Sequence, residues 1–174
     1  MRDRTIQLLI VAVFAVVACR KGPAREGASG VGTSTSKHGL SAESRVAADE
    51  LRQFIGEKLA QAPDATTHDA HVAEARRQLS ELRLKNKTDS DRKVTLLLAL
   101  LMAKDNERRR LVFQTRKGLD YASVQGDIAS LYEARERCNA ELLGWLEHTS
   151  TERTSLDSGP CLAEAQQAAA VLGQ

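Results

Sequence analysis

Three side chains of types that bind zinc follow one another at short spacing in the first half of the chain. They are His68, His71 and Glu74, which stand at positions i, i+3 and i+6 of a predicted helix and share roughly one face. Imidazole and carboxylate groups are ligands of Zn²⁺. The spacing is poorer than the i, i+4 histidine pair of zinc protease helices, and no fourth ligand is evident. We therefore expect a solvated helix start here and no metal site.

Other arrangements that carry catalysis are missing from the sequence. Ser, His and Asp residues do not occur in a nucleophile-elbow context, and no Gly-rich phosphate loop is present. Glu133 and Glu136 stand one helical turn apart beside Arg135 and Arg137, a pattern typical of surface ion pairs. The sequence therefore predicts a protein that is not an enzyme and that needs no cofactor.

Basic clusters are the first candidates for partner binding. Arg108, Arg109 and Arg110, followed by Arg116 and Lys117, form one cluster. A second cluster consists of Arg76, Arg77, Arg83, Lys85 and Lys87. Such clusters can contact phospholipid, lipopolysaccharide or an acidic partner. Acidic residues are interleaved with both, which favours a solvated face.

Two aromatic side chains, Tyr132 and Trp145, are further candidates. Aromatic residues dominate the hot spots of protein interfaces, so either could anchor a partner. A place in the hydrophobic core is the favoured interpretation for Trp145.

The start of the chain has the pattern of an export signal. Arg2 and Arg4 precede an apolar run from Ile6 to Ala18, in which Gln7 is the one polar side chain, and Cys19 follows at once. This is a basic n-region followed by an h-region of signal-peptide length. The run is too short to span a bilayer comfortably.

Residues 16–19, Val-Val-Ala-Cys, resemble the lipobox of bacterial lipoproteins, although Leu is commoner where Val16 stands. The resemblance covers residues 1–19. It implies that the signal peptide, residues 1–18, is removed and that Cys19 becomes a lipidated N-terminus carrying diacylglycerol and a further acyl chain such as palmitate. Three acyl chains would anchor the protein to the membrane essentially permanently. An ordinary secretory signal or a signal anchor is the alternative.

Residue 20 is Arg rather than Asp, and by the same resemblance this implies the outer membrane, with the protein facing the periplasm. The mature chain has 23 basic and 22 acidic residues once Arg2, Asp3 and Arg4 are removed with the signal. This near-neutral balance argues against a nucleic-acid partner.

Cys138 and Cys161 remain in the mature chain. In an exported protein an even pair of cysteines usually forms a disulfide, so we predict a Cys138–Cys161 bridge. An unstrained bridge of this span would stabilise the fold by about 3 kcal/mol. Two unpaired thiols, or a bridge between two chains, are the alternatives.

Composition and periodicity predict an all-α fold. Residues 19–40 are rich in Gly, Ser and Thr and read as a flexible tether with a reach of about 25 Å. Residues 41–174 form the predicted helical domain, with abundant Ala, Leu, Arg and Glu. Ser41 is the expected N-cap of the first helix. The second helix is expected to start near Thr66 or Thr67, and Thr66 with Asp69 has the spacing of a capping box. The predicted helices cover 41–61, 66–85, 91–147 (continuous, or broken near Gly118) and 161–172.

The apolar run 94–102 is expected at the buried centre. A second apolar series has near-heptad spacing and predicts a helix over about 120–147; its members are Tyr121, Val124, Ile128, Leu131, Cys138, Leu142 and Trp145. The expected architecture is an antiparallel helical bundle or extended helical hairpin of four to five helices.

The function that these features favour is a non-catalytic, lipid-anchored protein-binding module of the cell envelope, which escorts or assembles an envelope protein. An immunity or exclusion lipoprotein that protects the cell is one alternative, and a structural tether between membrane and cell wall is another.

Overall fold

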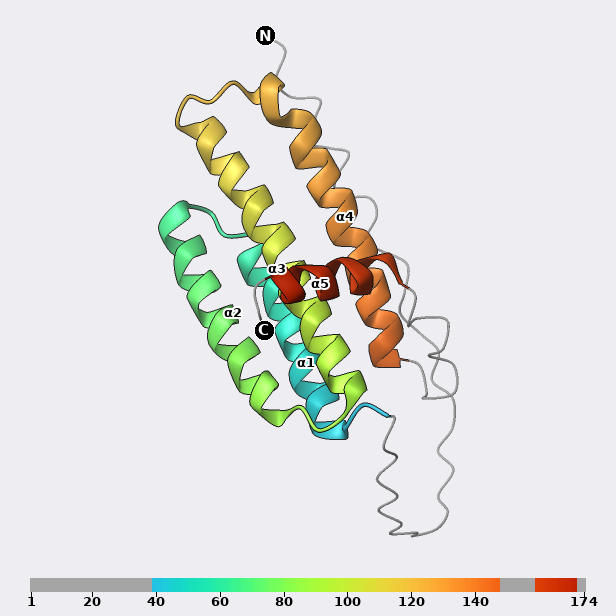
Figure 1. Ribbon diagram of the computed structural model, residues 1–174. Helices are drawn as coiled ribbons and strands as arrows, with labels where there is room; N and C mark the ends of the chain where they lie inside the picture. Colours follow the sequence, from blue (N-terminus) through green and yellow to red (C-terminus); the bar gives the residue numbers. More distant parts are fainter. Residues whose placement is uncertain (1–38, 148–158, 172–174) are drawn as a thin grey trace, which may run out of the picture. The chain divides into compact units, whose positions relative to one another are not determined.

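The computed structural model describes residues 39–147 and 159–171, and these form helices joined by short turns (Figure 1). The described part contains no strand, so the all-α prediction is confirmed. The elements are α1 (Ala42–Phe54), a π-helical turn η1 (Ile55–Leu59), α2 (Ala65–Lys85), α3 (Asp89–Arg116), α4 (Tyr121–Glu147) and α5 (Pro160–Val171).

The start of α1 is as predicted, whereas the start of α2 is not. The Ser41 hydroxyl accepts the N–H of Ser44 at 3.1 Å, which confirms Ser41 as the N-cap. The cap of α2 is Asp64, whose carboxylate accepts the N–H of Thr67 at 2.8 Å. The prediction of Thr66 was wrong because Asp64 directly follows Pro63, and its extended backbone places the carboxylate over the first turn.

The helix over 91–147 is broken in two. Thr88 and Asp91 form a reciprocal capping box at the start of α3. At the other end Gly118 has φ +108°, a conformation that glycine adopts without steric cost, and the chain reverses there into α4. Figure 1 shows α3 and α4 side by side as an antiparallel pair.

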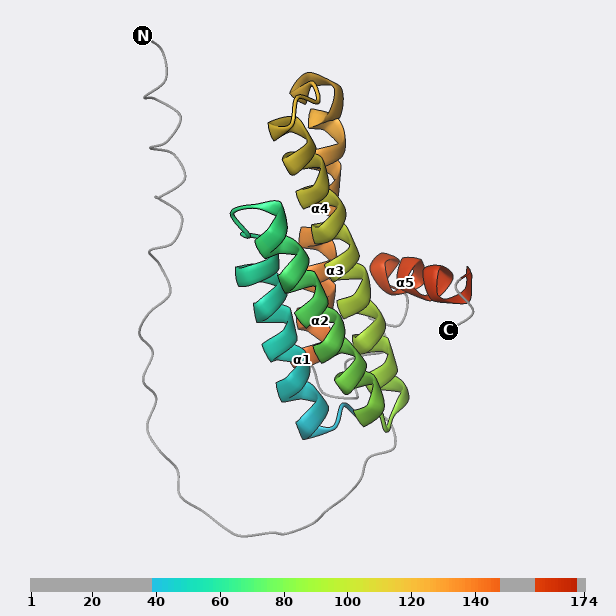
Figure 2. The same ribbon diagram turned by 90° about the vertical axis from the view of Figure 1, so that its left-hand side faces the viewer.

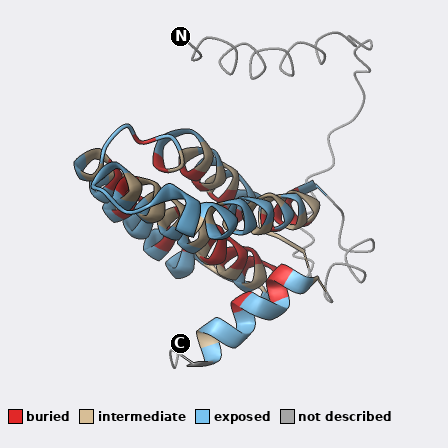
Figure 3. Cartoon of the chain, turned by 90° about the horizontal axis from the view of Figure 1, so that it is seen from above, coloured by how far each residue is buried: buried red, intermediate tan, exposed pale blue. Residues whose placement is uncertain are grey.

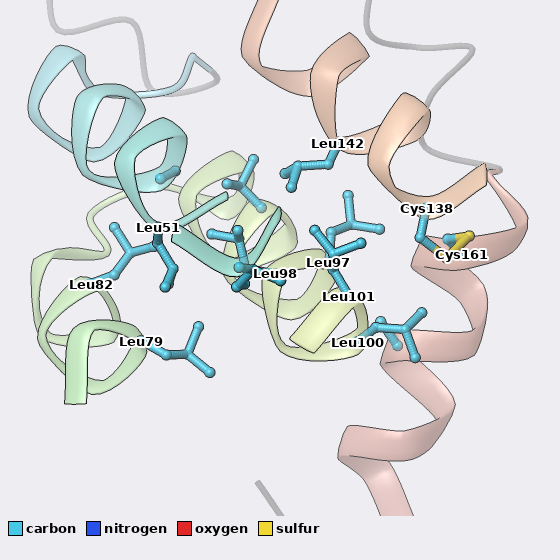
Figure 4. Packing of buried hydrophobic residues seen from close by; sticks show 14 of the residues in the cluster. Leu51, Leu79, Leu82, Leu97, Leu98, Leu100, Leu101, Cys138, Leu142 and Cys161 are labelled. Carbon is cyan, nitrogen blue, oxygen red and sulfur yellow. A yellow bond between two sulfur atoms is a disulfide. The ribbon is translucent and has the colours of Figure 1, made fainter. Parts of the chain in front are cut away.

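The core is built from the predicted seams of α2 and α3. Val72, Ala75, Leu79 and Leu82 of α2 are buried, and so are most residues of the apolar run on α3 (Figure 4). α1, η1, α4 and α5 contribute the rest of one cluster. This cluster lies in one of two compact units of the chain, residues 35–174, so this unit has its own core, as a domain that folds alone does.

The paired helices α3 and α4 continue past the start of α2, as Figures 1 and 2 both show. The helix predicted over about 120–147 is confirmed by α4. No residue of α4 before Cys138 is buried. Val124, Ile128 and Leu131 are half-buried, and Tyr121 is exposed. We call the pair formed by residues 109–132 the two-helix arm; on its α3 side, Phe113 still contacts His68 near the start of α2.

The last helix, α5, is fixed by its first turn. Cys138 and Cys161 form a disulfide with Cα atoms 5.4 Å apart, as predicted. The carboxylate of Glu141 accepts the N–H groups of Cys161 at 3.1 Å and Leu162 at 2.9 Å. Figure 3 shows the buried residues of α5 gathered at this end, with the remainder largely exposed.

None of the described helices combines the length and apolarity needed to cross a membrane.

Candidate partner-binding surfaces

Most arginines of the first basic cluster form hydrogen bonds within the domain. Arg108 donates to the carbonyl oxygen of Ala60 at 3.1 Å, Arg109 donates to that of Ala62, and Arg116 donates to that of Pro63 at 2.7 Å. These carbonyls belong to the turn between η1 and α2, where no helical N–H is available to them. The expectation of a solvated basic face was wrong for Arg108 and Arg109, because they hold this turn onto α3.

Arg110, the third arginine of the triplet, is exposed. It stands beside a small hollow of about 200 Å³ lined by residues of α2 and α3. Of the three predicted partner-binding arginines, Arg110 is therefore the one that presents its side chain to solvent. Sequence reasoning had no means of separating the three, because the carbonyl partners of Arg108 and Arg109 lie 48 and 47 positions earlier in the chain.

A buried ionic network lies beside the arginines that hold the turn between η1 and α2, which together we call the clamp. Asp105 is completely buried, and its carboxylate accepts from Arg135 at 3.1 Å and from Arg108 at 3.5 Å. Burial raises the pKa of Asp105, and the positive charge of Arg135 opposes that rise. The expectation that Arg135 and Glu136 form ordinary surface pairs missed this contact. The signal was present in the sequence, because Arg135 occupies one slot of the apolar series on α4.

The histidine pair does not form a solvated helix start. His68 is 1% exposed and its ring meets Phe113 edge-on, with the centroids 5.6 Å apart. Its Nε2 is buried without a hydrogen-bond partner in the described chain, and burial lowers the pKa of His68. His71 instead hydrogen-bonds through Nδ1 to the carbonyl oxygen of Lys58 at 3.0 Å.

His68, His71 and Glu74 thus have separate roles. Glu74 pairs with Arg77, which lowers the pKa of Glu74 to about 2 through the hydrogen bond it donates. The described residues contain no group of three His, Cys, Asp or Glu side chains placed to hold a metal ion.

The second basic cluster consists largely of surface ion pairs. Arg77 pairs with both Glu74 and Glu81, and the ammonium groups of Lys85 and Lys87 lie 3.5 and 3.9 Å from the carboxylate of Glu43. Exposed pairs of this kind contribute little to stability. Arg76 differs, because it forms no ion pair within residues 39–147 and 159–171.

The two aromatic candidates have opposite environments. Trp145 is 1% exposed and belongs to the core, and the ammonium of Lys93 lies 5.4 Å from its ring centroid. It is therefore not placed to anchor a partner, as the favoured interpretation held. Tyr132 is 52% exposed, with the guanidinium of Arg108 lying 5.9 Å from its ring centroid.

Tyr121 is a candidate that sequence reasoning missed, because it was considered only as one member of the apolar series that predicts the helix. It is 54% exposed and precedes Tyr132 by eleven residues, so both rings lie on nearly one stripe of α4, about 16 Å apart. Leu119, in the turn before α4, is also exposed. Three of the five exposed large apolar side chains in the described chain therefore lie on the two-helix arm.

Cys19, the predicted lipidation site, lies outside the described residues. Comparison with known proteins finds no matching family model, no matching curated protein and no matching solved structure.

Proposed function

We propose that this chain is a bacterial lipoprotein, attached through Cys19 to the outer membrane, whose helical domain faces the periplasm and binds an envelope protein without catalysing a reaction. The signal-peptide pattern and the lipobox-like residues 16–19 support the anchor. The hydrophobic core of the described helices supports a binding module, which the predicted tether would join to the anchor.

The observation that carries the binding role is the exposed aromatic stripe of the two-helix arm. Tyr121 and Tyr132 lie on one side of α4, and each is about half exposed within the described part of the chain. Tyrosine brings a large rigid apolar area together with a polar tip, which suits it to interface hot spots. A partner helix laid along the arm would contact both rings in a helix-in-groove mode.

The anchor is tested by metabolic labelling of the full chain in a bacterial host with a palmitate analogue. We expect labelled protein that partitions into the detergent phase, and we expect Cys19→Ser to lose both properties. A labelled Cys19→Ser variant, or an unlabelled native chain, would contradict the anchor.

The binding role is tested by placing a photo-crosslinking amino acid at Tyr121 or Tyr132 of the anchored protein in living cells. Glu50, an exposed residue of α1, is the matched control position. We expect one discrete protein adduct from the two arm positions and none from position 50. The identity of that protein would separate an escort from an immunity factor, and equal labelling from all three positions would contradict a specific site.

A further inference from the structure

A second surface lies away from the arm, where α2, α3 and α5 meet. They enclose a hollow of about 460 Å³, a volume within the range of small-molecule sites. Its floor is α3, and α2 and α5 form its two walls. Figures 1 and 2 show α5 crossing α3 at a steep angle, whereas α2 runs alongside α3, so the hollow is a corner.

The inner surface of this corner is aliphatic. Leu96, Leu100 and Met102 of α3 and Leu79 of α2 line it. The wall from α5 consists of alanines, whose short side chains leave the space open. No acidic or aromatic residue is among the lining residues. An extended hydrocarbon chain matches such a surface because it gains burial without presenting polar groups.

The α2 wall carries positive charge at both ends of the hollow. Arg76 and Arg83 line it and are seven residues apart, which is two helical turns or about 10.5 Å. Arg76 forms no ion pair within the described ranges, whereas the neighbouring Arg77 binds two glutamates outside the hollow. A guanidinium recognises a carboxylate through two parallel hydrogen bonds. The charge of the wall is therefore complementary to an anionic head group.

We propose that this hollow binds a single-chain anionic amphiphile, a free fatty acid, with its carboxylate at Arg76 and its chain along α3 and α5. Binding of a fatty acid would be a function additional to protein binding, and it would use a different surface from the two-helix arm. A stable protein interface takes roughly 20–30 residues on each side. Twelve residues bound this hollow, which fits one acyl chain better than a protein partner.

The test is calorimetric titration of oxidised residues 35–174 with dodecanoate below its micelle concentration, with amide NMR shifts to locate the site. We expect a single site, with shifts confined to residues 76–83, 96–103 and 165–169. Dodecyltrimethylammonium, which has the same chain and the opposite charge, should bind at least tenfold more weakly. Decanoate should also bind more weakly, because each methylene contributes up to roughly fourfold in affinity.

Variants separate the charge from the cavity. Arg76→Gln should weaken dodecanoate at least tenfold, and Arg77→Gln, adjacent on α2 but outside the hollow, should not. Ala168→Leu should fill the space and weaken every chain length, and matching circular dichroism and melting temperatures would show that all three variants fold. Arg76→Gln should leave crosslinking from the two-helix arm unchanged, so this proposal and the protein-binding role can fail separately.

Equal affinity for the cationic amphiphile, or full binding by both Arg76→Gln and Ala168→Leu, would overturn the proposal. Binding of phosphatidylglycerol vesicles in place of dodecanoate would also overturn it, since the ligand would then be a two-chain lipid surface.

Discussion

The carboxylate of Asp105 is completely buried in α3, and Nε of Arg135 in α4 lies 3.1 Å from it. Asp105→Asn keeps the shape of the side chain and leaves the largely buried Arg135 without its counter-charge. We expect a loss of about 3 kcal/mol in the free energy of unfolding, measured by urea denaturation of residues 35–174.

The paired replacement Asp105→Leu with Arg135→Met removes both charges and should cost less than Asp105→Asn alone. If the double variant is the less stable of the two, the pair is a net source of stability and the expectation is wrong.

Arg109 and its neighbour Arg110 form a matched pair for testing the clamp on the turn between η1 and α2. Arg109 donates to the carbonyl of Ala62, and its guanidinium stacks 4.7 Å from the ring centroid of Phe113. Arg109→Ala should cost about 1.5–3 kcal/mol, the range for a hydrogen bond made by a charged group. Arg110→Ala, at an exposed position, should change the urea midpoint little. Similar losses for both would show that the clamp does not stabilise the turn.

His68 makes stability depend on pH. Its pKa is lowered from the ordinary value of 6.5 because burial disfavours the charged ring. The charges of Asp69 and Asp105 oppose this shift, whereas those of Arg109 and His71 lower the pKa further. The unfolded chain therefore binds a proton below about 6.5 that the folded chain does not, and stability falls as the pH drops from 6.5 toward the lowered pKa.

His68→Phe should flatten the stability curve in that pH window while the acid loss due to carboxylates at lower pH remains. Denaturant midpoints between pH 7.5 and 5 would measure this. An unchanged slope in the variant would assign the pH dependence to other groups.

The disulfide should matter more to α5 than to the rest of the domain. Replacing Cys138 and Cys161 together by Ala should lower the free energy of unfolding by about 3 kcal/mol. Hydrogen exchange should show early loss of protection in α5, whereas α2 and α3 stay protected until global unfolding. Uniform loss of protection would mean that α5 is bound as firmly by its apolar contacts as by the bridge.

Glu141 and Gly159 should act as one unit at the start of α5. A Cβ added at Gly159 would lie 2.2 Å from Oε1 of Glu141, so Gly159→Ala must push away the carboxylate that accepts from Cys161 and Leu162. Glu141→Ala should cost about 1 kcal/mol, as the loss of a helix cap does. Gly159→Ala should cost a similar amount, and the double variant little more than either. Additive losses in a double-mutant cycle would show two independent effects.

Sequence reasoning succeeded where the signal is local. The seam of Val72, Ala75, Leu79 and Leu82 repeats within a few residues, so it identified a helix and its buried face correctly. The break near Gly118 was visible as a weak point but undecided, because a glycine alone does not terminate a helix; its positive φ depends on the packing of α4 against α3.

The errors arose where contacts are distant in sequence. Arg108 and Ala60 are 48 residues apart, and nothing near Arg108 distinguishes a carbonyl partner from solvent. Tyr121 was considered only as one member of the apolar series on α4, and periodicity alone does not reveal that its side chain is 54% exposed. The hollow between α2, α3 and α5 could not be predicted from the sequence either, since it depends on where the disulfide holds α5 against the other helices.

The π-helical turn η1 has a consequence for register. The N–H of Ala60 reaches back to the carbonyl of Ile55, five residues earlier, so this turn holds one residue more than an α-helical turn would. The wider π turn accommodates the additional residue locally, and Ile55 and Leu59, at its two ends, are both completely buried in the core. The Ala60 and Ala62 carbonyls that follow are held by Arg108 and Arg109. The length of this segment is therefore constrained by contacts on both sides, unlike that of an exposed loop, where insertions and deletions are ordinarily tolerated.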